Sequence, residues 1–413
     1  MPNLRSASSG AVFLGQLAVG AAAAPASKEH RLVLRPSRGE VRAGSGVRVV
    51  YDSGSGEVSS RLGYCGKLGV IRVLEPGVAM PRSLAEQVVV VVGASSGIGR
   101  ASALAFARRG AMVVCAARGV RALDTVVEEI TGAGGDAIAV PTDVADAAAV
   151  RALATRAEDR FGRIDTWVNV AAVSVFGRVE DITGDEFDRV MRVNFLGHVH
   201  GVHAALPALR RAGDGGIIGV SSVEGLRSFP LQAPYAASKC ALRALYDALR
   251  MELAQEGAPI AVSTILPAAI DTPFFEHARS KLGAMPKPPP PVYAPEIVAD
   301  AIVYTAVRPR REVVIGDAAL GLVAAQQLSP AMTDVFMSIP VFGVARPEAD
   351  RPDNGRDNLD APMDGPGQVH GSYGGPTLSH SPLTELLQHL PSPAEAVSGA
   401  ARALRRVLPT SDR

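Results

Sequence analysis

The sequence has little lysine, little cysteine and almost no net charge. Only five of its 42 basic residues are lysines, and 41 acidic residues bring the formal net charge to +1. Nucleic-acid binding needs a clustered excess of cations, so we expect no nucleic-acid partner. The three cysteines, Cys65, Cys115 and Cys240, show neither CxxC nor metal-ligand spacing. We therefore expect packed thiols and no metal site.

Long hydrophobic runs are also missing. A membrane-spanning helix needs roughly 20 consecutive apolar residues. The best candidate, residues 320–345, is interrupted by Gln326, Gln327, Asp334 and two prolines. We expect no transmembrane segment.

The first 79 residues lack periodicity and are rich in Gly, Ser and Arg. Residues 11–24, which follow Arg5, share features with a secretory signal, but Gln16 and the glycines weaken their apolar character. We expect 1–79 to be a disordered extension, or residues upstream of a natural start at Met80, and the protein to be cytoplasmic. A cleaved signal is the alternative.

From position 87 onward, short apolar runs alternate with amphipathic segments. Residues 88–92 are five consecutive valines, which is typical of a strand buried on both faces. Further strands are predicted at 111–117, 137–141, 166–170, 216–221, 260–266 and 312–316. Helices are predicted at 102–109, 123–131, 150–160, 187–211 and 235–255. This alternation predicts an α/β protein with a doubly wound Rossmann fold and a seven-stranded parallel sheet.

The domain boundaries follow from the same pattern. Residues 80–345 form one Rossmann-type catalytic domain that ends in apolar helices near 320–328 and 331–345. Residues 346–413 are a disordered tail, rich in Pro and Gly up to position 382. An amphipathic stretch at 383–408 either docks on the body or remains free.

A glycine-rich loop separates the first strand from its helix and predicts a dinucleotide site. Gly93 permits a tight turn, Gly97 lets the backbone approach a pyrophosphate, and Gly99 lets the helix pack closely on the sheet. The predicted phosphate-binding residues are Gly93, Ser95, Ser96, Gly97, Ile98 and Gly99. The spacing is GxxxGxG rather than GxGxxG.

The residues that end the second strand predict which dinucleotide is bound. An acidic residue there would accept a hydrogen bond from the ribose 2′-hydroxyl and repel a 2′-phosphate. The sequence instead has the neutral Ala117 followed by Arg118, which can form charge-assisted bonds to a phosphate. We expect NADP(H) as the preferred cofactor, with NAD(H) possible.

Tyr235 and Lys239 form a YxxxK motif one helical turn apart, so their side chains share one face of a helix. A phenol has a pKa near 10 and needs a nearby cation to act as an acid or base at neutral pH. Ser222, thirteen residues upstream, follows a predicted strand and can polarise the same substrate carbonyl. Asn194 lies in the preceding helical stretch, and these four residues are the candidate catalytic set.

The glycine loop and the Asn, Ser, Tyr and Lys set resemble those of the short-chain dehydrogenase/reductase family over residues 84–316. The resemblance implies that Asn194 holds a water molecule linked to Lys239, and that Asp143 and Val144 contact the adenine. It also implies cofactor contacts for Asn169, Ala171, Tyr235, Lys239, Pro267, Ile270 and Thr272. The sequence departs from the family pattern at Val92, Val170 and Ala268, which stand where Thr, Asn and Gly are usual.

The expected function is therefore an oxidoreductase acting on a small-molecule carbonyl or alcohol with NAD(P), through Tyr235 as acid and base. An epimerase or dehydratase of the extended relatives and a dinucleotide-sensing protein without catalysis are the alternatives. The long helices around Asn194 and Tyr235 form subunit contacts in the family. We thus expect a homodimer or homotetramer.

Overall fold

The computed structural model describes residues 39–43, 47–51, 82–335, 337 and 352–389. The chain divides into two compact units, Met1–Gly39 with Val50–Val70 and Glu40–Val49 with Ile71–Arg413. Strands β1 (Gly39–Ala43) and β2 (Val47–Tyr51) pair in a small sheet within the region for which we predicted no periodic structure. The second unit contains the large sheet and its helices.

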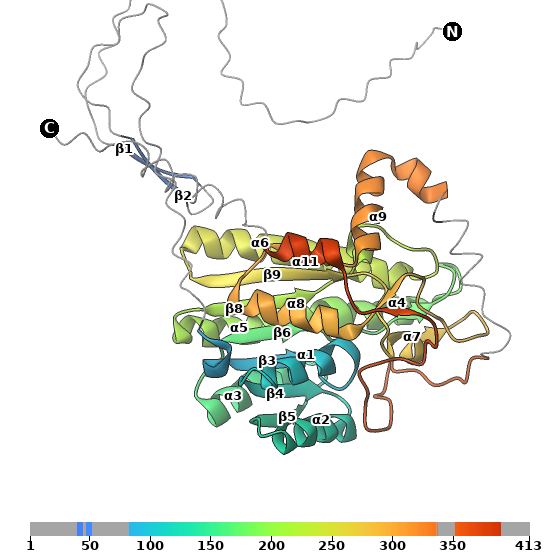
Figure 1. Cartoon of the computed structure of the whole chain (residues 1–413), viewed down its shortest axis with the longest axis horizontal. Coiled ribbons are helices and arrows are strands. Elements are labelled where there is room, and N and C mark those ends of the chain that lie inside the picture. The colour runs from blue at the N-terminus through green and yellow to red at the C-terminus, as the bar shows by residue number, and fades with distance from the viewer. Residues whose placement is uncertain (1–38, 44–46, 52–81, 336, 338–351, 390–413) are drawn as a thin grey trace, which may run out of the picture. The chain divides into compact units, whose positions relative to one another are not determined.

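The central element is a seven-stranded parallel sheet, as the sequence predicts (Figure 1). Its strands are β3 (Val88–Val92), β4 (Met112–Ala117), β5 (Ala137–Pro141), β6 (Thr166–Asn169), β8 (Gly215–Val220), β9 (Ile260–Pro267) and β12 (Glu312–Ile315). Their order across the sheet is β12-β9-β8-β6-β3-β4-β5. The order in which strands are added therefore reverses at β3, with β4 and β5 on one side and β6 on the other, and ligands of open α/β sheets bind at the carboxyl ends of the strands at such a point.

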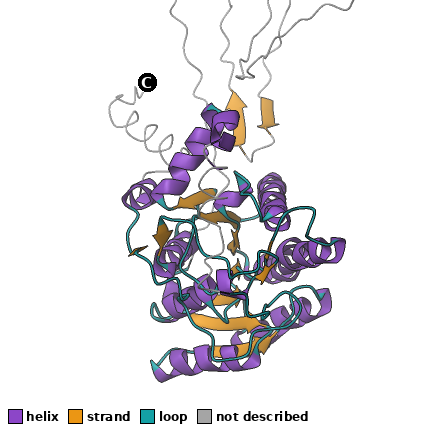
Figure 2. Ribbon diagram, turned by 90° about the vertical axis from the view of Figure 1, so that its right-hand side faces the viewer, coloured by secondary structure: helices purple, strands orange, loops and turns teal. Residues whose placement is uncertain are grey.

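Helices cover both faces of this sheet (Figure 2). One face packs against α1 (Gly97–Ala107), α2 (Val120–Gly132) and α8 (Pro295–Val307). The other packs against α3 (Ala147–Phe161), α4 (Gly184–Met191), α5 (Gly197–Ala212) and α6 (Ala233–Glu256). Four of the five buried valines of β3, Val89 to Val92, alternate between the two cores, which explains why that strand has no polar position.

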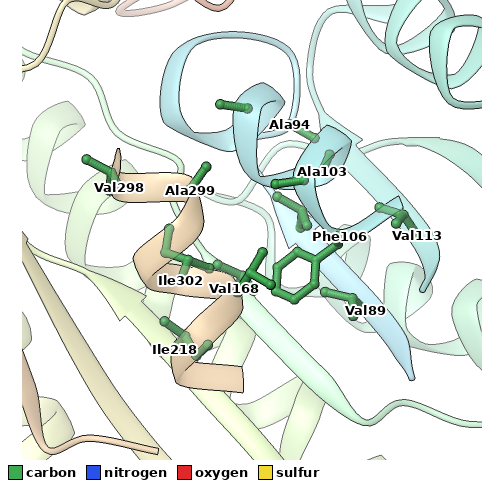
Figure 3. Close-up of a cluster of buried hydrophobic side chains, with 14 of the residues drawn as sticks. Val89, Ala94, Ala103, Phe106, Val113, Val168, Ile218, Val298, Ala299 and Ile302 are labelled. Carbon is green, nitrogen blue, oxygen red and sulfur yellow. The ribbon is translucent and has the colours of Figure 1, made fainter. Parts of the chain in front are cut away.

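Phe106 anchors the first of these cores. Figure 3 shows its ring on α1, close to Val89 of β3 and Val168 of β6, with Ile302 of α8 on the other side. Helix α8 was not among the predicted helices. Most of its residues are buried, and its exposed face carries only two charged residues, Glu296 and Asp300, so the polar stripe that marks an amphipathic helix is narrow.

The long helix predicted over 187–211 is interrupted. A π-helical segment, η2 (Arg192–Leu196), separates α4 from α5 and contains Asn194. Such single π turns often occur at functional sites. Helix α4 itself begins with a capping box in which Thr183 and Glu186 exchange hydrogen bonds with each other's backbone N–H groups.

The short elements lie mostly around the carboxyl ends of the strands. They are η1 (Leu84–Glu86), β7 (Val175–Phe176), η3 (Val223–Gly225), α7 (Phe274–His277), β10 (Arg279–Ser280), β11 (Val292–Tyr293) and β13 (Thr377–Leu378). Helix α9 (Asp317–Leu328) follows β12. Residues 330–335 are also helical, and most of the second apolar helix predicted at 331–345 lies outside the described residues. None of the described helices is long and apolar enough to cross a membrane.

The C-terminal region differs from the expected tail. Residues 352–381 are mostly irregular, as predicted, but they lie against the body and lead to α11 (Pro382–His389), beside β12. In Figure 1 the orange-red coil before α11 passes α4 and α7, and the backbone carbonyl of Leu359 accepts a hydrogen bond from Arg189 at 2.9 Å. Hydrogen bonds to groups far away in the sequence leave no periodic signal. The rest of the predicted 383–408 helix lies outside the described residues.

We predict that Gly219→Ala destabilises the domain, because a Cβ on β8 would collide with the ring of the buried Tyr246 on α6. Overpacking of this kind costs about 1–3 kcal/mol of unfolding free energy. Gly216→Ala is the matched control in the same strand, since its Cβ would meet nothing closer than 3.8 Å. Denaturant melts of the two variants check this, and equal stabilities would contradict the packing argument.

Candidate active site

A cavity of about 420 Å³ opens at the carboxyl ends of the strands. Fifteen of the eighteen predicted site residues lie in its wall. They are Gly93, Ser95, Ser96, Gly97, Ile98, Gly99, Arg118, Val144, Ala171, Ser222, Tyr235, Lys239, Pro267, Ile270 and Thr272. Segments that follow six different strands, together with Tyr235 and Lys239 of α6, thus converge on one site, at the place where doubly wound folds bind their ligands.

The glycine loop fits closely against the neighbouring strand ends. A Cβ on Gly93 would lie 2.7 Å from the backbone nitrogen of Ala171, and Gly93 has a φ of +103°. A Cβ on Gly99 would collide with the carbonyl of Gly93. Both positions therefore require glycine, which keeps the start of α1 directly beside the loop.

Helix α1 begins at this loop without a side-chain cap. The hydroxyl of its N-cap, Ser96, accepts no capping hydrogen bond. The first N–H groups of a helix carry partial positive charge and favour an anion. A helix start without a side-chain cap, glycines that permit close approach and the adjoining cavity together fit the pyrophosphate of a dinucleotide.

Arg118 lies at the end of β4, as predicted, and already has partners. Its Nη1 donates to the carbonyls of Leu359 and Asp360 at 3.5 and 3.2 Å, and its Nη2 donates to that of Asn358. Burial lowers its pKa, and the nearby carboxylate of Asp143 opposes that shift. Contacts with residues 358–360 could not be expected from the sequence, because about 240 residues separate them from Arg118.

Lys239 is a fully buried cation beside Tyr235. Its ammonium nitrogen donates to the carbonyl of Val220 at 2.9 Å and lies 5.4 Å from the centre of the Tyr235 ring. Burial lowers the pKa of Lys239 to about 7, although the charge of Glu224 acts in the opposite direction. Lys239 can therefore both hold and release a proton near neutral pH.

Tyr235 faces the cavity with Ser222 beside it. Burial raises the pKa of the Tyr235 phenol, the carboxylate of Glu224 raises it further, and a hydrogen bond with the Ser222 hydroxyl lowers it. The Ser222 oxygen also accepts from the backbone N–H of Glu224 at 3.1 Å, which fixes its orientation. The Tyr235 ring lies 5.1 Å from that of Phe274, which also lines the cavity.

Glu224 is a third ionisable group in this wall. Burial raises the pKa of its carboxyl to about 8, a backbone hydrogen bond at Phe229 lowers it, and the charge of Lys239 lowers it as well. Its Oε2 atom is buried and has no hydrogen-bond partner among the described residues. An unpaired buried oxygen at a cavity wall is available to a bound ligand.

Three predicted site residues lie outside the cavity wall. Asn169 accepts from the indole of Trp167 at 2.8 Å and donates to the hydroxyl of Tyr246 at 3.1 Å, below the floor of the cavity. Asp143 accepts from the N–H of Ala145 at 2.9 Å and pairs with Arg189. Their contacts with a cofactor stay predictions, as does any role in catalysis for the third residue, Asn194.

Asn194 connects two parts of the site by hydrogen bonds. Its side chain accepts from the N–H of Val173 at 2.8 Å, donates to the carbonyl of Val173 at 2.9 Å, and donates to the hydroxyl of Ser238 at 3.1 Å. Ser238 precedes Lys239 on α6, and Val173 lies in the loop after β6. Asn194 therefore joins the loop beside the glycine motif to the helix that carries the Tyr–Lys pair.

One wall of the cavity was not predicted from the sequence. This wall comes from the C-terminal region and consists of Asn358, Pro362, Met363, Asp364, Gly365, Pro366, Gly367 and Gln368. The only sequence signal is a dense run of Pro, Gly and Asp, which is equally typical of a free tail.

Comparisons with known proteins agree with this site. Residues 87–283 match the family described as short chain dehydrogenase. An uncharacterized oxidoreductase, YxnA of Bacillus subtilis, is 41% identical over 278 residues, which are 67% of this chain and 78% of that protein. Dehydrogenase/reductase SDR family member 7B of Bos taurus is 32% identical over 266 residues, 62% of this chain and 81% of that protein.

A solved structure is similar as well. It is a short chain dehydrogenase/reductase from Burkholderia phymatum in complex with NAD, at 28% identity and a TM-score of 0.56, covering 61% of this chain and 96% of the other. The chain therefore belongs to the short-chain dehydrogenase/reductase family. This family is one of oxidoreductases.

We predict that Asn194→Ala lowers the unfolding free energy by about 3 kcal/mol, because it leaves the buried N–H and C=O of Val173 without partners. Ser238→Ala, which removes the third hydrogen bond of Asn194 and leaves those of Val173 intact, should cost about 1 kcal/mol. Denaturant unfolding of both variants measures the difference. A smaller loss of unfolding free energy for Asn194→Ala than for Ser238→Ala would contradict the conclusion that Asn194 joins the loop after β6 to α6.

Proposed function

We propose that the protein interconverts a carbonyl and a secondary alcohol by hydride transfer, with Tyr235 as acid and base. The observation that carries this proposal is the meeting of Tyr235, Ser222 and Lys239 in the same cavity as the glycine loop. A nucleotide-sensing protein would need the loop but not those three side chains. The extended epimerases and dehydratases, the other alternative, usually have a different glycine spacing and a distinct substrate domain.

The bound dinucleotide supplies or accepts the hydride. During reduction, Ser222 donates a hydrogen bond to the substrate carbonyl oxygen, and Tyr235 transfers its phenolic proton to that oxygen. Because burial and Glu224 both raise the pKa of Tyr235, a cation must stabilise its phenolate. The ammonium of Lys239 is placed to do so, and its own lowered pKa lets it return a proton near pH 7.

The substrate side of the cavity is mainly aromatic. Phe229, Phe274 and Phe275 line it, and the rings of Phe274 and Phe275 meet edge to face at 5.3 Å. Glu224 adds one carboxyl with an unpaired oxygen. These features support a largely apolar ketone or alcohol with one hydrogen-bonding or cationic group that reaches Glu224.

We further propose a preference for NADP(H) over NAD(H). Ala117 and Arg118 support it, because the first leaves space and the second provides positive charge where a 2′-phosphate would lie. Asp364 in the same cavity wall is the feature that would favour NAD(H) instead, since a carboxylate accepts hydrogen bonds from ribose hydroxyls. The ratio of the two affinities therefore decides between the cofactors.

The oligomeric state that the family resemblance implies and the expected location are also part of this proposal. We propose a homodimer or homotetramer that uses α5 and α6 for contacts between subunits, and a cytoplasmic location.

We predict that Tyr235→Phe lowers the turnover number for ketone reduction by at least about a thousandfold, because the proton donor is lost. The dissociation constant for NADPH should stay within about twofold, since the ring remains. Tyr304→Phe is the control, because its hydroxyl donates to the Gln388 carbonyl outside the cavity. NADPH oxidation across a panel of ketones measures both variants, and full activity in Tyr235→Phe would end the proposal.

We predict that Arg118→Asp weakens NADPH binding at least about tenfold relative to NADH, because it replaces an attractive charge by a repulsive one. Arg156→Asp on α3 makes the same change of charge at an exposed position outside the cavity and should leave the ratio unchanged. Titration of the two cofactors gives the ratio. An unchanged ratio in Arg118→Asp would contradict the NADP(H) preference.

A further inference from the structure

Residues 358–371, here called the strap, cross the carboxyl ends of the strands from one face of the sheet to the other. The strap is held at each end by an apolar side chain. Leu359 is fully buried in the core on the α3, α5 and α6 face, and Val369 packs on the core of the α1, α2 and α8 face. The residues between these anchors therefore have to pass over the active-site cavity.

The strap contacts the glycine loop through backbone groups. The N–H of Gly97 donates to the carbonyl of Gln368 at 2.9 Å. Arg100 on α1 donates to the carbonyl of Pro366 at 3.3 Å, and Thr125 on α2 donates to the same carbonyl. Gly367 lies so close to the carbonyl of Ser95 that a Cβ there would collide with it.

Two further cofactor-site loops contact the strap. At the end of β4, Arg118 donates to the carbonyls of Asn358, Leu359 and Asp360. In the loop after β9, Asp271 lies 3.4 Å from a ring nitrogen of His370. A Cβ on Gly371 would approach the carbonyl of Thr272 to 2.7 Å. The strap thus connects the three loops from which the family resemblance expects phosphate and ribose contacts.

The strap does not fill the site that it crosses. The cavity of about 420 Å³ remains open beside the contacts between the strap and the glycine loop, and strap residues 362–368 and the glycine loop both line it. A segment that excluded the cofactor would put its own atoms into this space. A segment that encloses the cofactor would leave the space open and form its outer wall, as the strap does.

We propose that the strap is a part of the dinucleotide site that encloses the phosphate and adenosine half of the cofactor. This rests on the proposed dinucleotide-dependent function. Pro362 lies 3.6 Å from the position of a Cβ on Gly119, at the start of α2, so the strap reaches the end of β4 where the adenosine ribose is expected. The ligand is held between the strap and the strand ends.

The strap also positions Arg118. A guanidinium has five N–H donors, and the three backbone carbonyls engage Nη1 and Nη2 only in part. These bonds hold its plane in place while donors remain for an anion. Arg118 therefore acts both as an anchor of the strap and as the group that faces the 2′-position of the ribose.

The experiment uses Gly367→Ala in the full chain, with Gly355→Ala as the matched control. Both glycines have positive φ angles, +70° and +68°, so alanine strains the backbone equally. Only Gly367 has a backbone neighbour, Ser95, with which a Cβ collides, whereas nothing lies within 4 Å of a Cβ on Gly355. Gly367→Ala therefore lifts the strap without altering any side chain of the glycine loop.

We expect Gly367→Ala to raise the dissociation constants of NADPH and NADH about tenfold, which corresponds to about 1.4 kcal/mol. Gly355→Ala should bind both as the wild type does. Unchanged or tighter binding in Gly367→Ala would overturn the proposal, and tighter binding would identify the strap as a competitor. Binding is measured by titration without substrate, so the result does not depend on carbonyl chemistry.

Hydrogen exchange of the wild-type protein provides a second measurement that needs no variant. We expect saturating NADPH to slow exchange at the amides of residues 359–371, because an enclosed ligand holds the strap in place. Faster exchange there would show displacement and overturn the proposal. If the wild type binds neither dinucleotide, the proposed function fails as well, whereas wild-type binding with an insensitive strap refutes the strap alone.

Discussion

The active site depends on keeping one ammonium group, that of Lys239, out of water. A charge buried so deeply is unfavourable unless it is paired, and the carbonyl of Val220 and the carboxyl of Glu224 are the groups that compensate it. The position of Lys239 is set by α6, by the end of β8, and by Asn194 through its bond to Ser238. The chemistry of Tyr235 thus depends on packing that extends well behind the cavity.

Close approach of backbones imposes a second constraint. The glycine loop, the loop after β6 and the strap lie within van der Waals distance at Gly93 and Gly367, where no side chain could be accommodated. Backbone shape therefore defines the part of the cavity between the glycine loop and the strap. The substrate half is instead defined by side chains, among them Phe274 and Glu224.

The sequence predicted the sheet well because its strands are buried on both faces and read as uninterrupted apolar runs. All seven strands occur within one or two residues of the expected positions. The Tyr, Ser and Lys set was predictable because one helical turn and one strand end fix its geometry. Helix α8 was missed because most of its residues are buried and its exposed face is narrow. The π turn at Asn194 was missed because the pattern of a helix hardly changes over one extra residue.

The contacts of the C-terminal region could not be predicted for a different reason. Arg118 and Gln368 gain their partners from segments that are distant in the sequence, and a bond between a side chain and a remote carbonyl leaves no mark on either local pattern. The cofactor contact that the resemblance implies for Asn169 stays a prediction. In the structure its amide is engaged by Trp167 and Tyr246.

The bond between Gly97 and Gln368 joins the first helix of the domain to a residue near the end of the chain. A ribosome makes β12 more than forty residues before it makes the strap, so a nascent chain can complete its sheet while the groove above the strand ends is still open. Residues that are made after the whole sheet thus complete the wall of a cavity that the loop before α1 began.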